Sequence, residues 1–284
     1  MDIAHLKTFL EIYRIRHFGK AAEKLCITQS AASARIKLLE ERLGVSLFVR
    51  DRNAIEPTPA GHRFHRYAEM TVNGWERARQ MVTLPESYVR SLALGCPADI
   101  WHLFLVPHVD RLHQQLPDTA LNLSLHLGHQ VQELLLAGTL DLGLVFEPIN
   151  MPMLQAVEIT ALNLQLFANY PAGSLAEAMG EGYIMVDWGT LFEYEHSRRF
   201  ADLPAAPIRT SAGMMALDLL QTGRRAAYLP ERLTVQHPAG KRLYPVTAAP
   251  LFERHLFAVF RHGHDQHDLL QQVVAILSET LPAG

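Results

Sequence analysis

Apolar residues recur at helical spacing in the stretch between Thr28 and Gly44. Their intervals of four, three and four residues place them in one stripe on one face of a helix. The members of this stripe are Ala32, Ile36, Leu39 and Leu43. Thr28 can cap the helix through its hydroxyl, and Gly44 stands where a helix end favours a positive φ. Because the opposite face has only small, polar or basic side chains, we expect that face to be exposed.

Two further helices are predicted before this one. Asp2 can cap a helix that reaches about Arg16, and a short helix follows at residues 18–25. A tight turn joins the short helix to the helix after Thr28. Ala21 and Ala22 are small enough to let two helices cross closely. The pattern therefore predicts a helix-turn-helix.

A two-stranded hairpin is predicted directly after the helix-turn-helix. Residues 47–50 resemble a strand, residues 51–54 a turn, and residues 55–56 a returning strand edge. A basic hairpin tip in this place would lie on the phosphate backbone or in the minor groove of DNA. The first part of the chain is thus predicted to be a winged helix-turn-helix, and the alternative is a plain helical hairpin that binds no nucleic acid.

A long helix begins at Thr58, which can cap it, and Pro59 has the φ that a first helical residue needs. A heptad seam then continues nearly to Pro85. The seam residues, which we expect to mediate dimerisation, are Phe64, Ala68, Thr71, Trp75, Ala78 and Val82. A helix of roughly 25 residues is about 38 Å long. The small winged helix-turn-helix domain, which we call the head, cannot cover the whole seam of this helix. We expect the same helix of a second subunit to cover it; the alternative is packing within one chain.

From Tyr88 onwards, strand and helix patterns alternate to the end of the chain, which predicts a mostly parallel sheet. Strands are predicted at residues 91–95, 121–127, 141–146, 156–160, 164–169, 183–186, 226–229, 243–246 and 255–261. Helices are predicted at residues 103–116, 131–137, 192–200, 214–222 and 269–281, with Gly138 ending the second of them.

The N-terminal part of the chain resembles the LysR-type transcriptional regulators, over residues 1 to about 66. The shared pieces are Leu6-Lys7-Thr8-Phe9, Phe18, Ala21-Ala22, Leu25, Thr28-Gln29-Ser30-Ala31, Ser33, Ile36, Leu39-Glu40, Leu43-Gly44-Val45, Leu47-Phe48, Arg50 and Ala60-Gly61. Further pieces are similar to a narrower branch of the family, which holds a flagellar-operon repressor. These are Arg16-His17-Phe18-Gly19, Arg52-Asn53 and Trp188-Gly189. The family usually has Pro in place of Ser30, a difference that changes which bases can be read.

The resemblance implies an α+β multidomain protein with a two-lobed α/β effector domain similar to periplasmic binding proteins. It implies that the chain crosses between the lobes near Ala161 and again within residues 261–268, and that linker helices pair antiparallel in a dimer. The expected domains are the winged helix-turn-helix at 1–58, the linker and dimerisation helix at 59–87, and the effector domain at 88–284. Lobe one is expected at about 88–161 and 266–284, and lobe two at about 162–265.

The charge of the chain is unevenly distributed. Residues 1–66 contain 12 Lys or Arg and 7 Asp or Glu, a net charge of +5. Since the whole chain of 284 residues carries −3, the remainder carries −8. A basic head on an acidic body suggests that only the head meets polyanions. The two cysteines, Cys26 and Cys96, fall in different predicted domains, which fits a reducing cytosol. No apolar run suggests a membrane span or a signal peptide.

Enzyme motifs are lacking in the sequence. It contains no G-x-S-x-G, P-loop, G-x-G-x-x-G or H-E-x-x-H pattern, so we expect no catalytic residue and no cofactor. Three of the 15 histidines, His262, His264 and His267, are close together and could bind Zn²⁺. Their spacing matches no helix face, however, so we interpret the segment as a solvated crossing between lobes and expect no metal.

The exposed face of the helix after Thr28 is the predicted DNA-reading surface. Gln29 can make a bidentate contact with adenine, and Ser33 can bond a base or a phosphate. Lys37, Arg50 and Arg52 should act mainly on phosphates. The full predicted DNA-binding set is Thr28, Gln29, Ser30, Ser33, Ala34, Arg35, Lys37, Arg50, Arg52 and Asn53.

Effector-binding residues are predicted beyond the carboxyl ends of strands, where ligands lie in open α/β folds. Three segments fit that place, at residues 96–101, 146–148 and 187–189. The full predicted effector-binding set is Cys96, Ala98, Asp99, Trp101, Phe146, Glu147, Trp188, Gly189 and Ser211.

The predicted cleft is acidic, because Asp99, Glu147 and Asp187 all fall in these segments. A carboxylate ligand would be repelled unless a cation such as Arg224 or Arg225 turned inward. One hypothesis is therefore a neutral or cationic ligand held against the faces of Trp101 and Trp188. The alternative is that the acids cap helices or face solvent and that the cleft binds nothing.

The sequence thus predicts a cytoplasmic, homodimeric or homotetrameric transcriptional regulator and no enzyme. Its expected partners are double-stranded DNA, a small-molecule effector, a second copy of the chain and RNA polymerase, with no membrane. Ligand closure would change how subunits pack and so which half-sites they span. The rival is a small-molecule binding protein or enzyme whose helical head serves only for assembly.

Overall fold

The computed structural model describes residues 2–51, 54–147, 151–236 and 242–279. The chain forms two compact units. One unit comprises Met1–Ser91 with Glu133–Thr139, and the other comprises Leu92–Gln132 with Leu140–Gly284. No helix among the described residues is long and apolar enough to cross a membrane.

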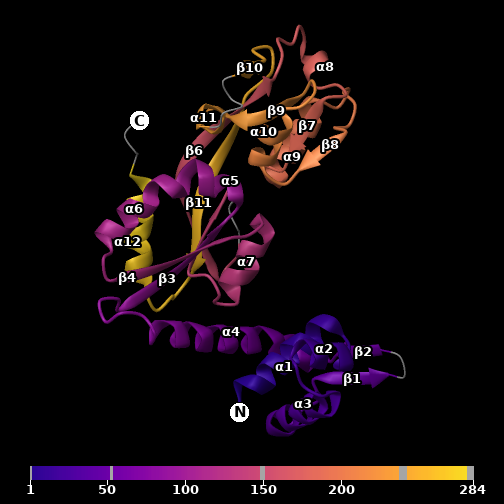
Figure 1. Cartoon of the computed structure of the whole chain (residues 1–284), viewed down its shortest axis with the longest axis vertical. Coiled ribbons are helices and arrows are strands. Elements are labelled where there is room, and N and C mark those ends of the chain that lie inside the picture. The colour runs from indigo at the N-terminus through magenta and orange to yellow at the C-terminus, as the bar shows by residue number, and fades with distance from the viewer. Residues whose placement is uncertain (1, 52–53, 148–150, 237–241, 280–284) are drawn as a thin grey trace. The chain divides into compact units, whose positions relative to one another are not determined.

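The first unit contains the three predicted helices, the wing and the long helix (Figure 1). Its elements are α1 (Ile3–Ile15), α2 (Phe18–Lys24), α3 (Gln29–Leu43), β1 (Phe48–Asp51), β2 (Ala54–Pro57) and α4 (Pro59–Met81). The strands β1 and β2 pair antiparallel, with Phe48 opposite Pro57. The predicted winged helix-turn-helix is therefore confirmed.

The predicted helix caps are present in the structure. Ala4 N–H donates to the Asp2 carboxylate over 2.9 Å, and Ala31 N–H donates to the Thr28 hydroxyl over 3.1 Å. Gly44 ends α3 with a φ of 69°. Each of these residue types offers what a helix terminus lacks, either an acceptor for an orphan N–H or a left-handed backbone.

The core of the first unit comes from the predicted stripe. Ala32, Ile36 and Leu39 of α3 are buried against α1 and α2. The prediction was wrong for Leu43, which is 39% exposed. Leu43 is the last residue of α3, so its side chain lies beyond the part of the helix that α1 covers.

The two halves of the α4 seam differ in burial. Phe64 packs its ring against Phe9 of α1, with centroids 5.1 Å apart, and Ala68 is buried. Farther along, Trp75 is 52% exposed and Val82 is 82% exposed in the single chain. The first half of the seam thus belongs to the core of the head, and the second half leaves a large aromatic side chain in solvent.

Gly61 allows α4 to pass close to the strand side of the head, and Gly61→Ala should destabilise the head by about 1–3 kcal/mol. A Cβ at Gly61 would lie 2.3 Å from the carbonyl oxygen of Leu47, which already accepts the Thr58 N–H. Gly74 is the matched control in the same helix, because a Cβ there meets nothing within 4 Å. Gly74→Ala should therefore stabilise α4 by about 0.5–1 kcal/mol. Equal hydrogen-exchange protection of the α3 amides in both variants would contradict this steric account.

The second unit is built around one mixed sheet (Figure 1). Its strands are β3 (Arg90–Cys96), β4 (Thr119–Leu125), β5 (Leu142–Val145), β6 (Leu154–Ala168), β7 (Tyr183–Val186), β8 (Ile208–Thr210), β9 (Ala226–Pro230), β10 (Tyr244–Pro245) and β11 (Phe252–Arg261). The order is β4-β3-β5-β11-β6-β9-β7-β8, and β10 pairs with β6. The prediction of a mostly parallel sheet was wrong at its centre, where β11 runs antiparallel to both β5 and β6.

The helices of this unit are α5 (Ala98–Ile100), a π-helical turn η1 (Trp101–Leu105), α6 (Val106–Gln115), α7 (Gly128–Leu136), α8 (Leu175–Ala178), α9 (Thr190–Arg199), α10 (Gly213–Leu219), α11 (Glu231–Gln236) and α12 (His267–Ser278). The last four residues of α7 belong to the first unit. The first predicted helix was placed too late, at residue 103. Helical structure already begins at Ala98, directly after Pro97, which puts Asp99 in a first turn at the end of β3.

Two long strands connect the two lobes of this unit (Figure 1). The prediction placed separate strands at 156–160 and 164–169, but β6 is one strand of 15 residues. Its partner β11 follows it from Phe252 opposite Leu164 to Arg261 opposite Leu154. The predicted crossing at Ala161 therefore lies inside a continuous ladder. The prediction of a second crossing within residues 261–268 was wrong, because His255 of β11 is opposite Ala161 and the chain returns inside β11.

Candidate nucleic-acid interface and effector cleft

The predicted DNA-reading face of α3 is open to solvent. Thr28, Gln29, Ser30, Ala34 and Lys37 are exposed, and Ser33 is half-buried. Ala32, Ile36 and Leu39 on the opposite side are buried in the head. The helix therefore presents amide, hydroxyl and ammonium groups to solvent, as a major-groove helix requires, and Leu38 beside Lys37 is also 38% exposed.

Four of the predicted DNA-binding residues are not part of this exposed set. Arg35 is half-buried, and its Nη1 donates to the Thr8 hydroxyl of α1 over 3.2 Å, so it joins two helices of the head. The backbone of Arg50 lies in β1, but its side chain is outside the described residues, and so are Arg52 and Asn53.

A cleft of about 660 Å³ lies between the two lobes of the second unit. Six predicted residues line it, namely Ala98, Asp99, Phe146, Glu147, Gly189 and Ser211. The prediction missed further lining residues, which include His126, Leu127, Gly128, His129, Gln132, Met151, Thr190 and Glu193. Most of these lie at the end of β4 or the start of α7 and α9, where the same rule about strand ends could have found them.

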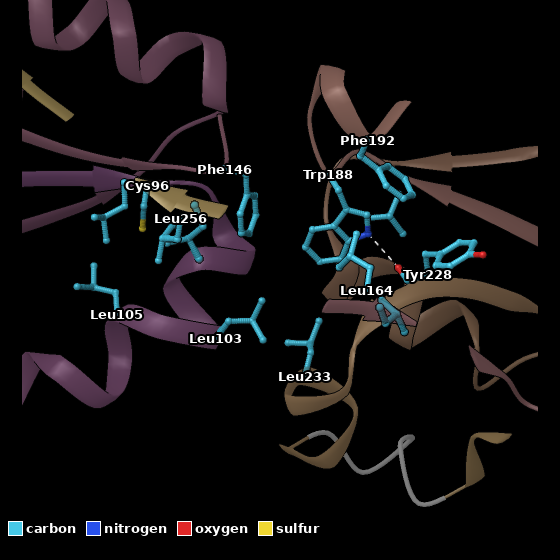
Figure 2. Close-up of a cluster of buried hydrophobic side chains, with 14 of the residues drawn as sticks. Cys96, Leu103, Leu105, Phe146, Leu164, Trp188, Phe192, Tyr228, Leu233 and Leu256 are labelled. Atoms are coloured by element: carbon cyan, nitrogen blue, oxygen red, sulfur yellow. Dashed lines mark hydrogen bonds between the residues drawn. The ribbon is translucent and has the colours of Figure 1, made fainter. Parts of the chain in front are cut away.

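Three predicted effector contacts do not line the cleft. Cys96 is fully buried between Leu105 and Leu256 (Figure 2), and burial raises the pKa of its thiol to about 12. Trp188 is also fully buried, with its indole N–H donating to the Tyr228 carbonyl over 2.9 Å. Trp101 packs against the core instead. The hypothesis of a ligand stacked on Trp101 and Trp188 was therefore wrong, since neither ring faces the cleft.

Asp99 has its carboxylate buried at the junction of the lobes, with 3% exposure. Gly213 N–H, at the start of α10, donates to both carboxylate oxygens over 2.9 and 2.8 Å, and Met214 N–H donates over 3.3 Å. Burial raises the pKa of Asp99 to about 6, with a further rise from Asp187, and the two backbone bonds oppose that rise.

Glu147 makes the second polar connection between the lobes. Leu191 N–H, in the first turn of α9, donates to its Oε1 over 2.6 Å. The Arg254 Nη2 donates to the same oxygen over 3.3 Å, and Arg254 is 1% exposed. Burial lowers the pKa of Arg254, and the Glu147 charge opposes that effect. The alternative that the acids cap helices is thus confirmed for Asp99 and Glu147.

The remaining charged groups of the cleft are bonded within lobe two. The Asp187 carboxylate accepts the Gly189 N–H over 3.0 Å, and Glu193 pairs with Arg209 over 2.5 Å. No Lys or Arg lines the cleft in the part of the chain that the structure describes. Arg224, which was considered as an inward cation, pairs with Glu177 instead.

The interpretation of the histidine-rich segment as a solvated crossing was wrong for His264, whose side chain is buried. His264 Nε2 lies 2.8 Å from the Asp141 carboxylate, and both side chains are buried. Asp141 also accepts the Ala93 N–H of β3. His264 therefore joins the turn after β11 to the start of β5.

Comparison with known proteins identifies the family. Residues 3–62 match the bacterial regulatory helix-turn-helix proteins of the lysR family, and residues 86–282 match the LysR substrate binding domain. A fold with a winged helix-turn-helix and a two-lobed sensing domain defines a transcriptional regulator with a DNA-binding and an effector-binding domain. The chain belongs to the LysR family of these regulators.

Within the family, the chain is similar to the HTH-type transcriptional regulators HdfR of Yersinia pestis and Yersinia pseudotuberculosis. It is 34% identical to each over 284 residues, which cover 96% of this chain and 95% of the relative. The narrower branch predicted from Arg16-His17-Phe18-Gly19 is therefore supported.

Solved structures agree in fold. CbnR complexed with its target DNA aligns with a TM-score of 0.65 and 21% identity, over 98% of this chain and 99% of that chain. A full-length OxyR variant from Pseudomonas aeruginosa aligns with a TM-score of 0.59 and 19% identity, over 98% of both chains.

Proposed function

We propose that α3 is the reading helix of this regulator, and that Gln29 and Ser33 contact base edges while Lys37 contacts phosphates. The observation that carries the proposal is the exposed polar face of α3, which lies opposite the buried side chains of Ala32, Ile36 and Leu39. An amide side chain at the first turn of such a helix can match the donor and acceptor pattern of adenine. Arg50, Arg52 and Asn53 of the wing remain predicted backbone contacts.

Gln29→Ala should weaken binding to the cognate site by about 1–3 kcal/mol and relax one base position, because a bidentate contact is lost. The measurement is fluorescence anisotropy with duplexes from the region upstream of the chain's own gene and with shuffled duplexes. An unchanged ratio of specific to random binding would show that Gln29 does not read a base.

Lys37→Ala is the control on the same exposed face. Since Lys37 acts on phosphates, the variant should weaken all duplexes similarly and lower the slope of affinity against salt by about one. A loss of affinity for the cognate duplex alone would show that Lys37 contacts bases and not phosphates.

The proposed assembly is a homodimer joined through α4, with residues 59–87 as the dimerisation segment and a tetramer as a further possibility. The exposed Trp75 and Val82 support this, because large apolar groups on one seam need a partner. Cytoplasmic location and contact with RNA polymerase remain predictions.

The cleft between the lobes is the proposed effector site, in a domain that begins near residue 88. Its volume of about 660 Å³ suits a small metabolite. The rival function, a binding protein or enzyme whose head serves only for assembly, predicts no salt-dependent, sequence-selective DNA binding. The anisotropy experiment above therefore separates the two functions.

A further inference from the structure

Two carboxylates of lobe one reach helix starts of lobe two. Asp99 accepts N–H groups of Gly213 and Met214 over 2.8–3.3 Å, and Glu147 accepts the Leu191 N–H over 2.6 Å. We name this set of bonds, together with the one from Arg254 to Glu147, the carboxylate clasp. Each acid comes from the end of a lobe-one strand, and each donor comes from the first turn of a lobe-two helix.

The backbone around the clasp leaves no room for other side chains. A Cβ on Gly213 would lie 2.8 Å from the Trp188 ring, and a Cβ on Gly189 would lie 2.6 Å from Glu147 Oε1. Gly189 also has a φ of 97°, which other residues rarely adopt. Gly189 therefore lets Glu147 approach the backbone of lobe two directly, and Gly213 leaves room for the Trp188 ring.

An aromatic contact lies beside the clasp. Figure 2 shows Phe146 of lobe one facing Trp188 of lobe two, and their ring centroids are 5.7 Å apart in an edge-to-face arrangement. Both rings are buried, so the lobes share an apolar contact as well as polar ones. Such a contact favours one relative position of the lobes, and the clasp completes the hydrogen bonds of that position.

The Glu147 half of the clasp has the chemistry of a carboxylate site that is already filled. Arg254 is a buried cation whose Nε has no hydrogen-bond partner among the described residues, and Glu147 is the acid that its Nη2 meets. The backbone N–H of Leu191 adds a second donor at the start of a ten-residue helix. A free carboxylate could make the same bonds only by displacing Glu147.

We propose that Asp99 and Glu147 substitute for the carboxylate of a ligand, so that the two lobes are held together without an effector and the cleft admits an uncharged or cationic molecule. This rests on the proposed role of the cleft as the effector site. The other residues that line the cleft are consistent with this ligand class, because they include the carboxylates of Asp187 and Glu193 and the thioether side chain of Met151.

The distance between the lobes in the full chain tests the clasp. Nitroxide labels would be placed at exposed positions of each lobe through His113→Cys and Ser197→Cys, in a Cys26→Ser background that removes the exposed native thiol. The labelled chain would be mixed with an excess of unlabelled chain, so that distances between subunits of the proposed dimer do not contribute. Pulsed electron resonance should then give one narrow distance distribution for the parent chain. Asp99→Ala and Glu147→Ala should each broaden it and shift it to longer distances.

Glu193→Ala is the matched control, since it removes a cleft carboxylate whose ion pair stays within lobe two. It should leave the distribution narrow. Distributions that are unchanged in Asp99→Ala and Glu147→Ala, or equally broadened in Glu193→Ala, would overturn the proposal.

Acetate provides the test of ligand class. In Glu147→Ala, millimolar sodium acetate should restore the narrow distribution, because it can take the place of the removed carboxylate beside Arg254, whereas sodium chloride at equal ionic strength should not. The parent chain should not respond to acetate, and acetate binding to it would overturn the exclusion of carboxylates. DNA binding is measured on the same samples, so that a failure of the clasp can be told apart from a failure of the proposed regulator function. If the Asp99→Ala and Glu147→Ala variants bind DNA normally and show no change in distance, only the clasp is rejected.

Discussion

We expect the Trp75→Glu variant to be a monomer at micromolar concentrations at which the wild-type chain is a dimer. Trp75 is half exposed in the single chain and lies at the centre of the exposed half of the α4 seam. A buried tryptophan at an interface commonly contributes at least about 2 kcal/mol, so the dissociation constant should rise by a factor of about 30 or more. Light scattering or sedimentation measures this change directly.

DNA binding should weaken together with dimerisation, because two linked heads bind two half-sites far more tightly than separate heads do. Gln80→Glu is the control, since it adds the same charge to an exposed position about 140° round the helix from Trp75. It should leave both measurements unchanged. A wild-type chain that is itself monomeric at micromolar concentration would reject the proposed interface.

The head could be predicted from sequence because its local signals agree with one another. The cap at Thr28, the stripe through Ala32, Ile36 and Leu39 and the positive φ of Gly44 all specify one helix. Leu43 was misplaced because periodicity gives the face of a helix and not how far its neighbours extend. Likewise, the heptad seam of α4 was visible in the sequence, but its division into a core half and an exposed half depends on how far α1, which runs antiparallel to α4, covers it.

The cleft could be predicted only in part. The rule that ligands lie beyond strand ends selected the segments that contain five of the six predicted lining residues, all except Ser211. It could not give the direction of a side chain, so Cys96 and Trp188, which belong to the same segments, were placed in the cleft although both are buried. The hydrogen-bond partners of Asp99 and Glu147 could not be predicted either. Gly213, for example, is 114 residues away from Asp99, and no local sequence pattern joins the two.

The second large effect concerns pH. The free energy of unfolding of the wild-type chain, measured relative to Asp99→Asn, should fall as pH rises from about 4 to about 7. Burial raises the pKa of Asp99 from 3.8 to about 6 in the folded chain. The folded state therefore holds this proton over a pH range in which the unfolded state has released it. The stability that the proton contributes is fully present below pH 4 and is lost as pH rises through about 6.

The expected change in the free energy of unfolding follows from the same pKa values. A rise from 3.8 to about 6 corresponds to about 3 kcal/mol between the two ends of the range. Asn is the right comparison, because its amide oxygen can still accept the Gly213 N–H while the side chain does not titrate. Groups with a lowered pKa, such as Glu11, act in the opposite direction, but their contribution cancels in the difference between the two chains.

Urea unfolding of the two full-length chains at several pH values, followed by tryptophan fluorescence, measures this difference. Two kinds of group act on the pKa of Asp99: the backbone N–H donors of Gly213 and Met214, which do not titrate, and the Asp187 carboxylate, which both chains contain. A difference that stays flat between pH 4 and 7 would mean that Asp99 is ionised throughout, and hence that its bonds to Gly213 and Met214 outweigh its burial. A difference that falls would show that ionisation of Asp99 destabilises the folded chain, as the burial of its carboxylate at the lobe junction predicts.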